Sequence, residues 1–329
     1  MGRHPRGRRA RRLARGGPRR GPDRSARAGR ERRRVSAPRL VLRGHELRPS
    51  PERPVIVGIV NASPESFSDG AEVGGLDDQV ARALRMRDDG ADLIDVGGES
   101  GVTDRPALDV AEEVARVVPL VERLVAEDVI VSVDTWKADV AREALAAGAA
   151  MINDVSGLRD PDLAEACAAH GAGLVVAHTR AEPKRKLFPA YSDVVADVVS
   201  FLRERTAEAR ARGVGEDQLV LDPGPDLSKL PVETITVLRS LPAIVALGRP
   251  VLLAVSRKDF VGALTGRPPH ERLGGTLAAI GAGLDAGGSI VRVHDVAAVR
   301  DFVAVRAALR GEADVPRDLT LDPGLRRAV

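Results

Sequence analysis

The chain has 329 residues, 43% of them hydrophobic, which is enough for one large core or two ordinary ones. No apolar run approaches the roughly 20 residues that a membrane-spanning helix needs, so we expect no membrane span. The single cysteine, Cys167, excludes an intramolecular disulfide, and its helix-like setting indicates a packing role.

The formal net charge of +3 hides a strong asymmetry. Residues 1–34 hold 15 arginines and two acids, about +13, which leaves about −10 for the other 295 residues. This segment lacks the apolar core of a secretory signal, so we expect residues 1–37 to be a disordered basic extension, or the product of a coding start placed too early. No aromatic residue interleaves its arginines, so we expect no nucleic-acid partner. We also expect the protein to be cytoplasmic.

Read in chain order, the sequence first forms a strand at residues 55–61 that ends in Asn61. Its residues are apolar and β-favouring around one glycine, as in a strand that is covered on both faces. The loop that follows, about residues 62–76, is rich in Ser, Pro and Gly and exceeds the two to six residues of a plain connection. We therefore expect this loop to contact a ligand.

Strands and helices then alternate to the end of the chain. Strands are predicted at 55–61, 92–97, 130–134, 150–155, 174–178, 219–222, 251–255 and 290–293. Helices are predicted at 79–89, 110–126, 138–147, 160–170, 193–212, 232–247, 273–286 and 297–309. Eight βα units without a G-x-G-x-x-G turn favour an α/β fold, a single (β/α)8 TIM barrel over residues 53–310 with a tail at 311–329.

Polar residues stand at or near the carboxyl ends of these strands, which converge on one face of a barrel. They are Asn61, Asp95, Asp134, Asn153, His178, Asp222, Lys258, Arg292 and His294. One group (Asp134, Asn153, Asp222, Lys258) suits the edge of a planar heterocycle. A second group (Asn61, Ser256, Arg292, His294) suits a phosphate or pyrophosphate, with Mg²⁺ held through Asn61.

Eight short motifs, each on the predicted face, resemble the dihydropteroate synthase family of pterin-binding barrels. They are NASPESFSDG (61–70), DVGGES (95–100), SVDTWK (132–137), INDVSG (152–157), LDPG (221–224), SRK (256–258), GTLAA (275–279) and RVHDV (292–296). The resemblance covers nearly all of residues 55–310.

The resemblance implies a transferase of folate biosynthesis that joins a dihydropterin methyl pyrophosphate to para-aminobenzoate with Mg²⁺. Asp95, Asp134 and Lys258 would be catalytic, and Asp134, Asn153, Asp222 and Lys258 would bind the pterin. Asn61 would coordinate Mg²⁺, Arg292 and His294 would bind the pyrophosphate, and Ser256 would face the aminobenzoate. It also implies a homodimer.

Departures from the family pattern cluster in the loops. The second loop reads ES-GVTDRPAL, with Thr103, Arg105 and Pro106 in place of the usual T-R-P-G, and the pattern after the fifth strand is AHT. The chain thereby resembles the divergent second synthase of actinobacteria. One alternative is therefore a paralogue that binds the pterin pyrophosphate without making dihydropteroate, and another is a pterin-binding methyltransferase.

Overall fold

The computed structural model describes residues 38–62, 75–99, 103 and 106–325. The chain divides into residues Met1–Ser36 and a compact unit, Ala37–Val329, to which every described element belongs. Most of the predicted ligand loop, together with Ser100 and Arg105, lies outside the described residues.

Eight parallel strands form the centre of this unit, in the order β8-β7-β6-β5-β4-β3-β10-β9. A parallel bridge between Leu221 and Val251 joins the two ends of this order, and the amide of Leu221 donates to the carbonyl oxygen of Pro250 at 2.9 Å. The sheet thus closes into the predicted barrel. Its strands are β3 (Val55–Asn61), β4 (Leu93–Gly97), β5 (Val131–Asp134), β6 (Met151–Asp154), β7 (Gly173–Ala177), β8 (Leu219–Asp222), β9 (Leu252–Leu253) and β10 (Ile290–Val293).

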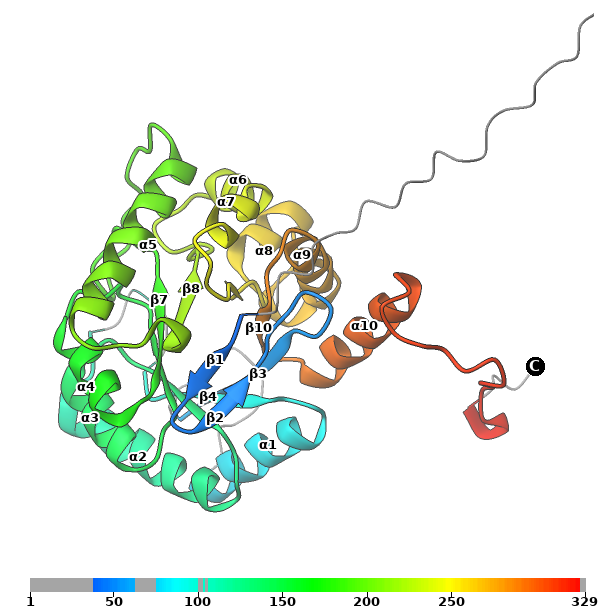
Figure 1. The fold of residues 1–329 in the computed structure, drawn as a ribbon, viewed down its shortest axis with the longest axis horizontal. Coiled ribbons are helices and arrows are strands. Elements are labelled where there is room, and N and C mark those ends of the chain that lie inside the picture. The colour runs from blue at the N-terminus through cyan, green and yellow to red at the C-terminus, as the bar shows by residue number, and fades with distance from the viewer. Residues whose placement is uncertain (1–37, 63–74, 100–102, 104–105, 326–329) are drawn as a thin grey trace, which may run out of the picture. The chain divides into compact units, whose positions relative to one another are not determined.

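Helices surround these strands (Figure 1). They are α1 (Leu76–Asp88), α2 (Val110–Ala126), α3 (Ala138–Ala146), α4 (Asp162–His170), α5 (Val194–Ala211), α6 (Pro231–Arg239), α7 (Leu241–Val245), α8 (Asp259–Thr265), α9 (Leu273–Asp285) and α10 (Val296–Leu309). None of these described helices is long and apolar enough to cross a membrane.

Two differences separate these helices from the predicted ones. The single helix predicted at 232–247 is broken at Ser240 into α6 and α7, because Pro242 has no amide hydrogen with which to continue the ladder. Helix α8, which was not predicted, follows directly after Lys258 and ends at Gly266 in the left-handed conformation.

An antiparallel hairpin of β1 (Leu40–Leu42) and β2 (His45–Leu47) precedes the barrel and was also not predicted. Its two turn residues, Arg43 and Gly44, both have positive φ, at 45° and 88°, as a tight type I′ turn requires. Leu40 and Leu42 are fully buried, and a side chain on Gly173 of β7 would overlap Leu42. Figure 1 shows the hairpin lying across the strands.

Two apolar layers result from this arrangement. The larger layer lies between the strands and the helices, and it includes Ile56, Val96, Val133 and Leu174. The smaller layer joins Leu40 and Leu42 to inward-facing strand residues, namely Val55, Val57, Leu93, Met151, Val175, Val220, Leu252 and Ile290. The hairpin therefore fills the amino-terminal half of the barrel with side chains, which leaves the carboxyl ends of the strands as the place for polar groups.

Candidate active site at the carboxyl ends of the strands

A buried polar network joins four strands of the barrel. Asp95 of β4 is 1% exposed, and its Oδ1 accepts from Ser132 Oγ at 2.5 Å. Its Oδ2 accepts from Asn153 Nδ2 at 3.0 Å and from Arg292 Nε at 2.5 Å. Arg292 Nη2 also donates to Asp134 Oδ2 at 2.8 Å. One guanidinium from β10 thus bridges the carboxylates of β4 and β5, and Asp95 has a partner on both oxygens.

Asp134 is the carboxylate of this network that remains partly open, with 22% of its side chain exposed. Burial raises its pKa to about 7, and repulsion from Asp95 and Glu113 acts in the same direction. The positive charges of Arg292 and Lys258 oppose this rise. Near neutral pH, Asp134 can therefore either accept or donate a hydrogen bond.

Asn153 carries the clearest sign that the network is incomplete. Its side chain is buried and its Nδ2 is used by Asp95, but its Oδ1 has no hydrogen-bond partner among the described residues. Buried polar atoms in native proteins are nearly always paired, so this oxygen is a vacant acceptor. Asn153 pairs in register with Asp134, which places the vacant acceptor on the strand next to the open carboxylate.

Asp222 supplies another carboxylate from the end of β8. It is 3% exposed, and its Oδ1 accepts from the Gly224 amide at 2.7 Å. Burial raises its pKa, while Lys258 and Lys229 lower it. Lys258, at the start of α8, therefore places positive charge near both Asp134 and Asp222.

Ser256 and His294 form a separate pair between β9 and β10. Ser256 Oγ lies 2.9 Å from His294 Nδ1, and it also accepts from the His294 amide at 3.3 Å. His294 stands two residues after Arg292, but the Arg292 guanidinium is engaged by two carboxylates. In this structure the predicted anion-binding pair thus consists of His294 beside Ser256 and an Arg292 that already has partners.

Asn61, the predicted metal ligand, is the last residue of β3. Its Oδ1 and the Cβ of Asp134 would each lie 3.8 Å from a Cβ built on Gly97, so both flank the same strand end. Among the described residues no three His, Cys, Asp or Glu side chains gather in a way that could hold a metal ion. One amide oxygen fits Mg²⁺ only where water and ligand phosphates supply the other donors, as is common for this ion.

The prediction that His178 faces the same site is wrong. Leu174 and Val176 of β7 point towards the helices and Val175 points into the barrel, so His178 continues the outward series. Its ring lies 4.9 Å from the ring of Phe201, and its Nε2 is 2.9 Å from Asp197 Oδ2, both on α5. Burial lowers its pKa to about 4. His178 is a neutral packing residue.

Lys229 was not among the predicted site residues, but the structure gives it a definite place. Its ammonium, 1% exposed, donates to the carbonyl oxygens of His178, Gly224 and Leu227 at 3.2, 2.9 and 3.0 Å. Burial lowers its pKa to about 7. Lys229 therefore joins the segments that follow β7 and β8, and no pattern in the sequence names those carbonyl partners.

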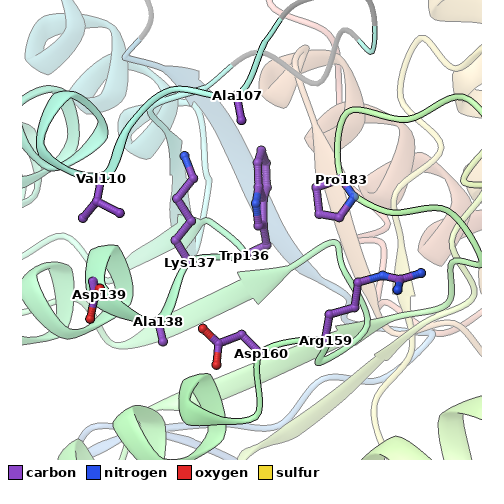
Figure 2. A pocket seen from close by; sticks show the side chains of 9 residues that line it. All are labelled: Ala107, Val110, Trp136, Lys137, Ala138, Asp139, Arg159, Asp160 and Pro183. Carbon is purple, nitrogen blue, oxygen red and sulfur yellow. The ribbon is translucent and has the colours of Figure 1, made fainter.

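A hollow of about 480 Å³ lies among the segments that follow β5, β6 and β7 and the start of α2. Its lining residues are Ala107, Val110, Trp136, Lys137, Ala138, Asp139, Arg159, Asp160 and Pro183. Figure 2 shows Trp136 standing between Lys137 on one side and Pro183 and Arg159 on the other. Lys137 is itself tied to Glu99 and the buried Glu113, at 3.1 and 2.6 Å. Trp136 forms a wall of this hollow.

Comparison with known proteins agrees with this geometry. The family model described as pterin binding enzyme matches residues 57–294. Dihydropteroate synthase of Bacillus subtilis is 40% identical over 266 residues, 80% of this chain and 91% of that protein. A protein of Mycobacterium tuberculosis named inactive dihydropteroate synthase 2 is 41% identical over 272 residues, 79% of this chain and 84% of its own length.

Solved structures give the same result. The structure of Xanthomonas albilineans dihydropteroate synthase in complex with 7,8-dihydropteroate has a TM-score of 0.74 and 42% identity, and the match covers 85% of this chain and all of that one. The same enzyme with 4-aminobenzoic acid has a TM-score of 0.77. With the barrel, the family match and these identities together, the chain belongs to the dihydropteroate synthase family of pterin-binding enzymes.

Proposed function

We propose that the chain binds a dihydropterin methyl pyrophosphate at the carboxyl ends of the strands and condenses it with para-aminobenzoate to dihydropteroate. The observation that carries this proposal is the vacant Asn153 Oδ1, on the strand next to Asp134 and two strands away from Asp222 in the barrel. A pterin edge presents N–H donors side by side, and an amide oxygen with two carboxylates at the same end of the barrel is an acceptor set of matching kind.

Charge then determines what these residues do in the reaction. Loss of pyrophosphate leaves a cationic pterin methylene, which Asp134 and Asp222 stabilise as nearby carboxylates. Arg292 and His294 hold the departing anion, so Arg292 exchanges part of its hold on Asp95 and Asp134 for the phosphates. Asp95 has partners on both oxygens, so it acts by orienting Arg292 and Asn153. Lys258 places positive charge near Asp134 and Asp222, the two carboxylates that would contact the pterin.

Mg²⁺ fits this proposal: Asn61 would help to hold the ion, which when bound would neutralise charge on the departing pyrophosphate. Ser256, beside His294, would face the aminobenzoate. We also propose a homodimer. Its support is the exposed apolar side chains of Val305 and Leu309 on α10, and light scattering of the purified protein tests it. We further propose a cytoplasmic location, with which the buried free thiol of Cys167 agrees.

A matched pair of variants tests the pterin site. Asn153→Leu removes the vacant acceptor and one hydrogen bond to Asp95, whereas Ser132→Ala removes only a hydrogen bond to Asp95. If the pterin uses Asn153 Oδ1, Asn153→Leu weakens pterin pyrophosphate binding roughly ten- to hundredfold, the usual effect of leaving a buried donor unpaired. Ser132→Ala then changes binding by only a few fold. Equal losses in both variants would contradict the proposed contact.

A second candidate function is pterin pyrophosphate binding without dihydropteroate synthesis. It is favoured by the M. tuberculosis relative named as inactive and by the altered loop sequence around Thr103. The deciding assay supplies pterin pyrophosphate and Mg²⁺ with or without para-aminobenzoate, and follows both pyrophosphate and dihydropteroate. Dihydropteroate formed only with all three components establishes the synthase, while tight binding without product establishes the binding paralogue.

A further inference from the structure

The turn that carries Ser256 and Lys258 is held in an unusual backbone conformation. Arg257, between them, has a φ of 58°, a left-handed value that a side chain with a Cβ seldom adopts. Its amide donates to Thr276 Oγ1 at 3.0 Å, and its guanidinium grips Asp295 through Nε and Nη2, at 3.2 and 2.8 Å. Such a conformation persists only where surrounding contacts enforce it.

Arg272, at the start of α9, holds the other side of this turn. Its Nη1 lies 2.8 Å from the carbonyl oxygen of Arg257, 3.1 Å from that of Lys258 and 3.0 Å from Asp259 Oδ1. Its Nε donates to the carbonyl oxygen of Arg267 at 2.9 Å, and only 11% of its side chain is exposed. The guanidinium therefore donates hydrogen bonds to the backbone carbonyl groups on both sides of the Lys258 α-carbon.

A glycine makes room for this grip. A methyl group on Gly262 of α8 would overlap the Arg272 guanidinium, so the arginine reaches the turn only because residue 262 has no side chain. Gly274, at the second position of α9, has nothing within 4 Å of the place a methyl group would take. These two helical glycines form a natural pair of test and control positions.

We propose that Arg272 is a positioning residue, which sets the position of the Lys258 ammonium relative to Asp134 and Asp222. It does so through its hydrogen bonds to residues 257–259, which the absence of a side chain at Gly262 makes possible. Arg272 acts on the ligand only through Lys258, since its own hydrogen bonds go to backbone carbonyls and Asp259. The role in binding rests on the proposed function, because Lys258 matters to a ligand only if the pterin binds there.

Calorimetric titration with dihydropterin methyl pyrophosphate and Mg²⁺ tests the role in binding. Gly262→Ala displaces the guanidinium without removing its charge, and alanine suits a helix better than glycine. We expect Gly262→Ala to weaken binding about tenfold and Gly274→Ala to leave it within twofold of the unchanged protein. In a Lys258→Ala background, Gly262→Ala is expected to add no further loss, because both act through one group.

A readout without ligand separates this proposal from the proposed function. The chain has five lysines, so reductive methylation with ¹³C gives a simple NMR spectrum in which Lys258→Ala assigns the Lys258 signal. We expect that signal to shift in Gly262→Ala and in Arg272→Gln, and to stay in place in Gly274→Ala. Thermal melts of the same samples confirm that each variant is folded.

The outcomes divide cleanly. An unshifted Lys258 signal in both folded variants overturns the positioning role, whatever ligand the site takes. Full affinity in Gly262→Ala, or the same loss in the Lys258→Ala background, overturns it as well. A shifted Lys258 signal in a protein that binds no pterin pyrophosphate upholds the positioning of Lys258 and defeats the proposed function instead.

Discussion

His178→Gln tests whether the buried imidazole is held neutral. The imidazole of His178 packs against the ring of Phe201 and lies beside the carboxylate of Asp197, both on α5. Lys229 and Arg180 place positive charge near it. Its Nδ1 is buried without a hydrogen-bond partner among the described residues, so a protonated ring would leave a charged donor unpaired. Glutamine keeps a neutral group that can donate to Asp197 and removes the titration.

The magnitude follows from the pKa of His178, about 4 in the folded chain against about 6.5 in the unfolded chain. Between these values the unfolded chain binds the extra proton, so this group stabilises the fold fully above pH 6.5 and progressively less as the pH falls towards 4. From pH 7.5 to pH 5.0 the loss is about 2 kcal/mol.

The measurement is urea unfolding of the unchanged protein and His178→Gln at both pH values. Asp134, with a pKa of about 7, works in the opposite direction, because the folded chain holds its proton between about pH 4 and 7. That contribution is common to both proteins and cancels in their difference. On lowering the pH, the unchanged protein should therefore lose about 2 kcal/mol more than the variant. Parallel losses would refute a neutral His178.

Four further changes probe other parts of the molecule. Leu42→Ala should lower the free energy of unfolding in urea by about 2–5 kcal/mol and leave product formation at 25 °C unchanged, because its contacts fill the half of the barrel away from the site. Arg292→Met leaves Asp95 buried without its cation and should lower the free energy of unfolding in urea by about 3–5 kcal/mol; an unchanged free energy of unfolding would contradict the pairing. Burial raises the pKa of Cys167 to about 12, so a thiol reagent should label it only as fast as the chain unfolds. A chain that begins at Val35 should keep its melting temperature and activity, since every described element follows that residue.

Much of the barrel could be predicted because strand and helix periods are local properties of the sequence. The strand predicted at 219–222 matches β8 and the helix predicted at 110–126 matches α2. The hairpin escaped prediction because its turn reads Arg-Gly, whereas Asn-Gly or Asp-Gly is the usual signal. The conformation of Arg43 is supported by contacts with residues far away in the sequence, such as the hydrogen bond that its amide donates to the carbonyl oxygen of Gly171.

The site was predictable as a face but not as a set of partners. The positions of Asp95, Asp134 and Arg292 at strand ends predicted that they share one end of the barrel, and the structure confirms their proximity. Which carboxylate receives the guanidinium depends on side-chain packing between strands far apart in the chain. His178 shows the limit of the rule, because a residue one step past a strand end turns outward as readily as inward.

The hairpin also bears on the order in which the protein can be built. It is the first described structure to leave the ribosome, yet the residues that bury Leu40 and Leu42 come from strands as late as β9 and β10. Val55 likewise waits for its neighbour Ile290. The nascent chain must therefore carry two unburied leucines and an open β3 edge through almost all of synthesis, which makes its amino-terminal strands the segments most in need of a chaperone.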